Sequence, residues 1–300
     1  MRGALATRVV LVVIGAVAVA HAQLLPFVSE RGGGPLSVRS MGRCPPANFS
    51  AVPLDVMAYA AAPWYVQKQL PLNYQPVNEL YCVRAEYTLR NPSNISAGLI
   101  ANNYANRGGV NGAVQGSSKY DRNNATLLAL PADTPDGSDG RLLVGPKELL
   151  DMFPRAWRSI FGPYWVVAVG PSKNATIKYD WAIISGGQPK YEAANGTCTT
   201  LPPNNRTAVD AALLAALNES AMRAPRITGR PLQPPAFDSG GLWFFSRKPV
   251  DPEATAAMTQ RAQGSAVPPT DWLLTDVTAE LGLDTSKLVP VQQEGCKYQA

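Results

Sequence analysis

The chain has 300 residues, 46% of them hydrophobic, which is long enough to bury one sizeable core. Only 16% of the residues are charged, and 27 prolines and 25 glycines predict short elements joined by many turns. The formal charge of +5 comes from scattered lysines and arginines, which argues against nucleic-acid binding. The chain contains one histidine, His21.

Residues 1–22 have the pattern of a secretory signal peptide. Arg2 and Arg8 give a positive start, residues 9–20 form an apolar run, and Ala20-His21-Ala22 resembles a cleavage site. An uncleaved anchor is the alternative, although the run is short for a membrane span. Cleavage after Ala22 would lower the formal charge from +5 to +3 and remove the only histidine. It would thereby exclude histidine-dependent catalytic triads, Cys–His dyads and histidine-ligated zinc or haem sites.

The cysteine pattern and the glycosylation motifs also indicate a secreted protein. Four cysteines imply two disulfides with three alternative pairings, and none lies in the C-x-x-C spacing of redox or zinc sites. Seven N-x-S/T motifs predict a glycosylated surface. The asparagines are Asn48, Asn94, Asn124, Asn174, Asn195, Asn205 and Asn218.

In chain order, an extended leader (23–43) precedes a series of predicted strands. Residues 81–89 alternate, with Val83, Ala85 and Tyr87 on one face and Arg84 and Glu86 on the other. The other strands are expected at 64–70, 97–105, 110–118, 127–130, 141–144, 164–169, 179–185, 242–246 and 288–291.

Helices are predicted mainly in the second half of the chain. A short helix and an irregular turn are expected over 147–160, which contains Pro154, and an Ala-rich helix over about 208–222. A helix over 252–263 would begin after the N-cap Asp251, and one or two helical turns would follow at about 271–281. The pattern as a whole predicts an all-β domain, either a sandwich or a barrel.

Three motifs resemble the lipocalin family, most closely its apolipoprotein D-like and bacterial-type branch. The first is Leu54-Asp55-Val56 with Tyr59 and Trp64-Tyr65, although Ala62-Pro63 stands where the family has Gly-x. The second joins residues 164–169 to residues 179–184, similar to the paired strands F and G of the family. The third is the segment 242–249, which ends in Arg247-Lys248-Pro249 and looks like the last barrel strand.

This resemblance implies an eight-stranded antiparallel up-and-down β-barrel, the lipocalin calyx, with a C-terminal α-helix. The domain would span residues 44–300, with inserts near 125–160 and 187–240. The resemblance also implies the cysteine pairing: Cys44 with Cys198, and Cys82 with Cys296.

The resemblance further assigns roles to aromatic and charged residues. Trp64 would lie at the closed end of the barrel under Arg247, as a structural pair. The residues expected to contact a ligand share inward strand faces or belong to the aromatic strands F and G. They are Trp243, Phe245, Tyr164, Trp181, Tyr179, Val66 and Lys68.

The function implied is that of a secreted, non-enzymatic protein that binds or transports a small hydrophobic ligand, such as a fatty acid, lipid, sterol or pigment. No cofactor, metal or nucleic-acid partner is expected, while peripheral contact with lipid or a membrane surface is compatible with this function. One alternative is an enzyme of the de-epoxidase or isomerase type, which would need Glu86 or Asp180 inside the barrel. The other is a structural or recognition glycoprotein. The sequence indicates no oligomeric state.

Overall fold

The computed structural model describes residues 43–47, 49–72, 74–116, 119–120, 126–202, 240–263 and 281–298. All of them belong to one compact unit, Met41–Ala300. The predicted signal peptide and most of the predicted leader lie outside the described residues. So do the helices predicted at 208–222 and 271–281, and four glycosylation motifs, at Asn48, Asn124, Asn205 and Asn218.

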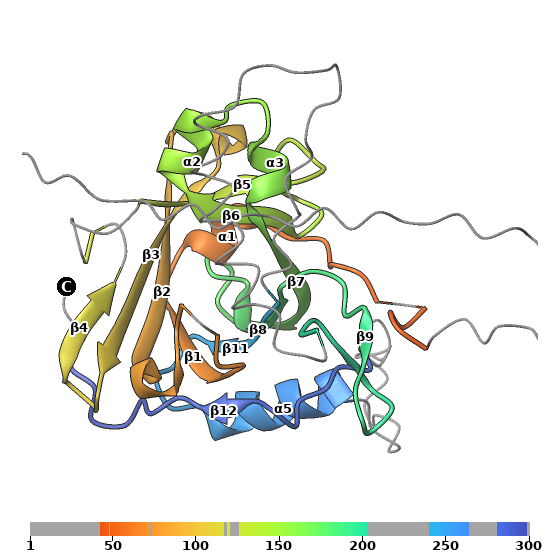
Figure 1. Ribbon diagram of the computed structural model, residues 1–300. Coiled ribbons are helices and arrows are strands. Elements are labelled where there is room, and N and C mark those ends of the chain that lie inside the picture. The colour runs from red at the N-terminus through yellow and green to blue at the C-terminus, as the bar shows by residue number, and fades with distance from the viewer. Residues whose placement is uncertain are drawn as a thin grey trace, which may run out of the picture. The chain divides into compact units, whose positions relative to one another are not determined.

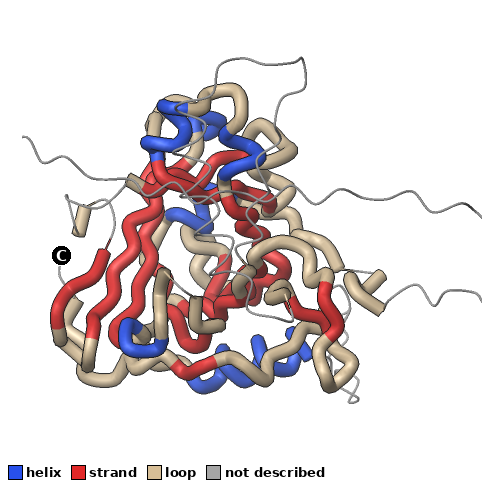
Figure 2. Tube along the Cα trace, in the orientation of Figure 1, coloured by secondary structure: helices blue, strands red, loops and turns tan. Residues whose placement is uncertain are grey.

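Strands dominate the described chain, and the helices lie outside the ring of strands or at its end (Figure 2). The wall strands are β1 (Trp64–Gln69), β2 (Tyr81–Leu89), β3 (Leu99–Arg107), β5 (Leu127–Pro131), β6 (Arg141–Pro146), β7 (Gly162–Pro171), β8 (Tyr179–Ser185) and β11 (Leu242–Ser246). Short strands are β4 (Ala113–Gly116), β9 (Tyr191–Glu192), β10 (Cys198–Thr199) and β12 (Val289–Pro290). The helices are α1 (Val56–Ala60), α2 (Lys147–Met152), α3 (Trp157–Ile160) and α5 (Pro252–Gln263), with 3-10 turns η1 (Val77–Glu79) and η2 (Ile95–Ala97).

The eight wall strands form a closed antiparallel barrel, which confirms the predicted fold (Figure 1). Each strand pairs with the next in chain order, and β11 pairs with both β8 and β1, so the ring has no free edge. β4 and β5 pair with different parts of β3, β4 with its C-terminal half and β5 with its N-terminal end.

On β2 the alternation of apolar and polar residues matches the inner and outer faces of the barrel wall. On β2, Val83, Ala85 and Tyr87 belong to the interior cluster of apolar side chains. Arg84 and Glu86 point the other way and form an ion pair at 3.0 Å on the outer face. This is the division predicted from the sequence of residues 81–89.

Two helical layers cover parts of the outer wall. Ala254, Met258 and Ala262 of α5 join a second apolar cluster with Ile183 of β8 and Phe244 of β11. The helices α2 and α3 contribute to a third cluster with outward residues of β5 and β6. The segment 125–160, expected as an insert, therefore contains two strands of the barrel wall together with the helices that cover them.

The C-terminal segment fills the wall between β1 and β2. β12 pairs with Lys68 and Gln69 at the end of β1, and the Gln293 side chain donates to the backbone carbonyls of Val66 (2.8 Å) and Val83 (2.7 Å). Val289 and Val291 join the interior cluster. The last strand is therefore part of the barrel and not merely a tail on its surface.

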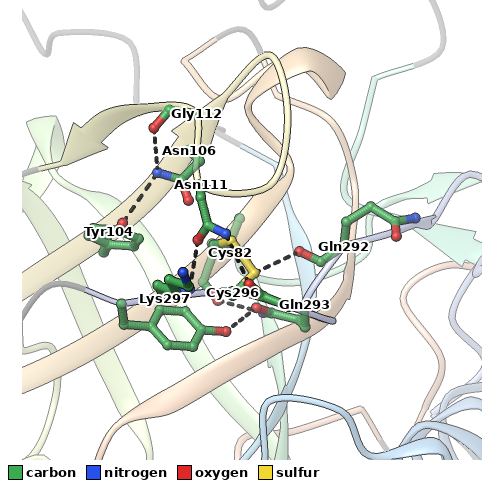
Figure 3. Close-up of a disulfide and its surroundings, with 12 residues drawn as sticks. Cys82, Tyr104, Asn106, Asn111, Gly112, Gln292, Gln293, Cys296 and Lys297 are labelled. Carbon is green, nitrogen blue, oxygen red and sulfur yellow. Dashed lines mark hydrogen bonds between the residues drawn. A yellow bond between two sulfur atoms is a disulfide. The ribbon is translucent and has the colours of Figure 1, made fainter.

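Two disulfides fix the ends of the described chain, in the pairing that the resemblance implies. Cys44 bonds to Cys198 on β10, and Cys82 on β2 bonds to Cys296. Figure 3 shows the second bridge beside the tip of the β3–β4 hairpin, where Asn111 accepts a hydrogen bond from the backbone amide of Lys297 at 2.7 Å.

Candidate ligand site in the barrel interior

Four of the seven residues predicted to contact a ligand face the interior, and a fifth, Tyr179, packs against the same cluster beside α1, where its hydroxyl accepts a hydrogen bond from the backbone amide of Asp55 at 2.8 Å. Val66 on β1 and Phe245 on β11 are buried members of the interior cluster, and Trp243, Tyr164 and Tyr179 are partly buried members of it. Val66 and Phe245 are also direct neighbours across the β1–β11 pairing. The structure therefore brings together, on one inner surface, predicted residues from three different strands.

The other two predicted ligand residues lie outside the barrel. A bulge between Val66 and Lys68 reverses the alternation of β1, so Lys68 pairs with the outward Phe244. Trp181 has the same parity as the outward Ile183 and belongs to the cluster beneath α5. Sequence periodicity alone cannot reveal a bulge, and one residue of register decides which face an aromatic residue takes.

Trp64 and Arg247 close one end of the barrel, hereafter the closed end. The guanidinium carbon of Arg247 lies 3.4 Å from the centre of a Trp64 ring, and the Trp64 indole N–H donates to the carbonyl of Tyr59 at 2.9 Å. Burial lowers the pKa of Arg247 to about 10.

The five N–H donors of Arg247 are all engaged with backbone carbonyls. They donate to the carbonyl oxygens of Ala58, Tyr59, Ala62, Pro63 and Tyr179. The guanidinium has no further donor for a ligand. Arg247 therefore holds the closed end together and offers a ligand only its charge.

Three tyrosines form a group of hydroxyls in the interior, hereafter the tyrosine triad. The Tyr164 hydroxyl lies 2.6 Å from that of Tyr59 and 2.7 Å from that of Tyr87. Burial raises the pKa of Tyr87 to about 12 and raises the pKa of Tyr59 and of Tyr164 well above the usual tyrosine value, so all three hydroxyls stay protonated at neutral pH. Sequence reasoning placed Tyr87 on the inward face but assigned no role to it or to Tyr59, since spacing does not show where hydroxyls converge.

Trp243, Leu127 and Val144 also pack against the interior cluster but remain partly exposed. Gln69 pairs with Trp243 across the sheet and is fully buried, and its Oε1 has no hydrogen-bond partner. Gln69 was not predicted as a site residue, because its inward orientation depends on the bulge at residue 67.

The arrangement of Trp243 requires a glycine two residues earlier. A Cβ atom at Gly241 would lie 2.1 Å from the Trp243 ring, and Gly241 has a φ of +138°. Glycine alone fits both the space and the backbone conformation. The indole therefore lies directly over the backbone at the point where the chain enters β11.

Neither of the two carboxylates that the enzymatic alternative would need lies in the barrel interior. Glu86 lies on the outer face between Arg84 and Lys119, which lower the pKa of its carboxyl against the opposing effect of burial, and Asp180 is exposed. The described part of the chain contains no group of three His, Cys, Asp or Glu side chains placed to hold a metal ion. Nor is any of its helices long and apolar enough to cross a membrane.

Neither a protein-family model nor a curated protein sequence matches the chain. Among solved structures, insecticyanin from the tobacco hornworm Manduca sexta is similar with a TM-score of 0.42 and 14% identity, over 86% of this chain and 90% of that one. The major allergen Per a 4 from cockroaches is similar with a TM-score of 0.39 and 13% identity, over 82% and 92% of the two chains. The pairing of strands within the chain itself defines the fold.

Proposed function

We propose that this chain is a secreted protein of the lipocalin type that binds a small hydrophobic molecule inside its barrel. The observation that carries the proposal is the closed barrel whose inner surface is apolar and aromatic yet incompletely buried. Trp243, Tyr164 and Val144 face inward and keep part of their surface exposed. An apolar inner surface with a few polar groups is what a small hydrophobic ligand needs.

The driving force for binding would be the transfer of apolar surface out of water, at ~25 cal/mol per Å². The aromatic side chains of Trp243, Phe245 and Tyr164 supply large, rigid contact areas. No chemical step is required. The enzymatic alternative loses support because Glu86 and Asp180, the carboxylates it would need inside, both lie outside the interior cluster.

The test compares two tryptophans on neighbouring strands that face opposite sides of the wall. Purified protein is titrated with a neutral fluorescent naphthylamine dye, and binding is followed by energy transfer from tryptophan. Trp243→Ala should weaken binding about tenfold, since it removes roughly 1.5 kcal/mol of apolar contact. The matched control Trp181→Ala, on the outer face, should leave the dissociation constant unchanged. Equal effects of the two substitutions, or no binding by the wild type, would contradict the proposal.

Secretion and glycosylation are a separate part of the proposal. The three described glycosylation motifs, at Asn94, Asn174 and Asn195, all have exposed asparagines in turns or loops. Exposure is what an attached glycan requires. Expression in a eukaryotic secretory host should yield a mature chain beginning at Gln23, and glycosidase treatment should lower its mass. Retention of residues 1–22 in the product would rule out the signal peptide.

A further inference from the structure

A groove on the outside of the barrel, hereafter the outer groove, runs between β1 and α5. It is lined by one face of α5, from Pro252 to Gln263, and by Gln67 and Lys68 of β1. Its volume is about 690 Å³, within the range of roughly 300–1,000 Å³ that is typical of sites for small molecules. None of the described residues that line it belongs to the interior cluster. The outer groove is therefore a space distinct from the barrel interior.

The Gln67 side chain holds the base of the outer groove in place. Its Nε2 donates to the backbone carbonyls of Lys248 at 3.0 Å and Pro249 at 3.1 Å, and its Oε1 accepts from the Asp251 amide at 3.1 Å. Gln67 is only 9% exposed, and these bonds tie β1 to the start of α5. The base of the groove is therefore fixed before anything binds, which lowers the entropic cost of binding.

The charges in the outer groove favour an anion. Its described lining contains two charged side chains, Lys68 and Asp251. The Asp251 carboxylate already accepts from the Ala254 amide at 3.1 Å and from the Ser246 hydroxyl at 2.6 Å, at the positive end of the α5 dipole. Among the described residues, the Lys68 ammonium has no ion-pair partner. Lys68 is therefore the charge that remains for a bound molecule.

The rest of the lining combines apolar surface with few free donors. The Thr255 and Thr259 hydroxyls each donate to the backbone carbonyl four residues earlier, at 2.7 Å, so their hydrogens are already used. Val250 is 56% exposed, and Pro252 and Ala256 are exposed beside it in the lining. Their apolar surface is available for contact without any rearrangement of the helix.

We propose that the outer groove binds a small organic anion with an apolar body. The Lys68 ammonium pairs with the anionic group, and Val250, Pro252 and Ala256 contact the apolar body. Lys68, predicted as a ligand residue inside the barrel, thus serves a different site on the outside of the wall. This second site does not depend on whether the interior is occupied.

The experiment compares naphthalene sulfonate with its neutral analogue, naphthalene sulfonamide, which has the same apolar body. Binding of each to the full-length protein is measured by isothermal titration calorimetry at neutral pH and low ionic strength. The wild type should bind the sulfonate about fivefold more tightly than the sulfonamide, the value of one partly exposed ion pair. Added salt should reduce this preference, because the pair is accessible to water.

Three variants locate the site. Lys68→Met keeps a long side chain without the charge and should abolish the preference for the sulfonate. Its matched control, Lys173→Met, removes the same charge from an exposed turn between β7 and β8 and should leave the preference intact. Ala256→Trp places an indole in the groove at an exposed position of α5 and should weaken binding of both molecules about tenfold.

The neutral naphthylamine dye separates the outer groove from the interior. Saturating dye should leave the sulfonate affinity unchanged, and so should Trp243→Ala. Displacement of the sulfonate by the dye, a preference that survives in Lys68→Met, or no binding of the sulfonate by the wild type would overturn this inference and leave the proposed function intact. A wild type that binds the sulfonate but no dye would overturn the proposed function alone.

Discussion

At the scale of single residues, Arg247 connects three parts of the chain that lie far apart in sequence. Its carbonyl partners come from residues 58–63 and from Tyr179, and its guanidinium covers Trp64. The planar fork of arginine satisfies several carbonyls at once, which the single ammonium group of lysine cannot reproduce. The closed end therefore depends on the shape of this side chain as well as on its charge.

Arg247→Lys should lower the free energy of unfolding by about 3 kcal/mol, because it leaves several buried carbonyls unpaired and removes the stacking on Trp64. Urea denaturation of the two proteins measures the difference. Arg90→Lys, at an exposed position, serves as the control and should change stability by less than about 0.5 kcal/mol. An Arg247→Lys protein with the same free energy of unfolding as the wild type would show that the carbonyl contacts contribute little to stability.

The buried tyrosines make stability depend on alkaline pH. In the unfolded chain a tyrosine ionises near its usual pKa of about 10, while burial raises the pKa of Tyr87 to about 12 in the folded protein. The folded state thus holds more protons than the unfolded state between these values, and stability falls as pH rises through this window. Below about pH 10 the contribution of Tyr87 is fully present.

The free energy of unfolding should therefore decline above about pH 10, with a loss on the order of 3 kcal/mol from Tyr87 by pH 12. Urea titrations at a series of alkaline pH values measure the decline. Tyr87→Phe should have a shallower decline than the wild type, because it lacks one of the groups whose pKa is raised. Identical slopes in the two proteins would show that the Tyr87 hydroxyl is not protected from ionisation.

At the scale of elements, α5 and the barrel share one apolar surface on the outside of the wall. Met258 is fully buried against residues of β8 and β11, and Asp251 begins the helix by accepting a hydrogen bond from the Ala254 amide at 3.1 Å. The cluster beneath α5 is separate from the interior cluster. Stability and ligand binding should therefore be separable by mutation.

Met258→Ala should destabilise the protein by about 2–4 kcal/mol through the cavity it leaves under α5. Gln260→Ala, on the exposed side of the same helix, is the control and should have little effect. Dye affinity, measured well below the melting temperature, should be the same in both variants. A weaker affinity in Met258→Ala would mean that the outer cluster supports the interior site.

At the scale of the whole molecule, the two disulfides have different neighbours. Cys82–Cys296 anchors the segment that follows β12. Val289 in β12 and Val291 just after it both pack in the interior cluster. Cys44–Cys198 instead joins a loop to β10, outside the barrel. Each bridge closes a long loop, of 154 residues for Cys44–Cys198 and 214 for Cys82–Cys296. Long loops give a disulfide its largest effect on the unfolded chain.

Replacing either cysteine pair by serine should cost about 2–5 kcal/mol of stability. Ligand affinity should fall when Cys82 and Cys296 are replaced, because β12 then loses its covalent anchor. It should stay unchanged when Cys44 and Cys198 are replaced. Thermal unfolding and dye titration of the two double variants measure both quantities. Equal affinities would indicate that Gln293 and the β12 pairing suffice to seat the last strand.

Much of this organisation follows from local sequence pattern. The alternation in residues 81–89 gives the inner and outer faces of β2, and Asp251-Pro252 marks the start of α5. The outward positions of Lys68 and Trp181 could not be predicted, because one depends on a bulge and the other on register. The tyrosine triad joins α1, β2 and β7, and only the folded chain shows that their hydroxyls meet.

The closure of the barrel has a consequence for the order of events during synthesis. β11 bonds to β8 on one side and to β1 on the other, and it is the last of the eight wall strands to leave the ribosome. Until residue 246 has emerged, both β8 and β1 present unpaired edges, which are templates for association with other chains. Nascent chains of this protein are therefore most exposed to misassembly during synthesis of residues 186–241, the longest stretch between consecutive wall strands.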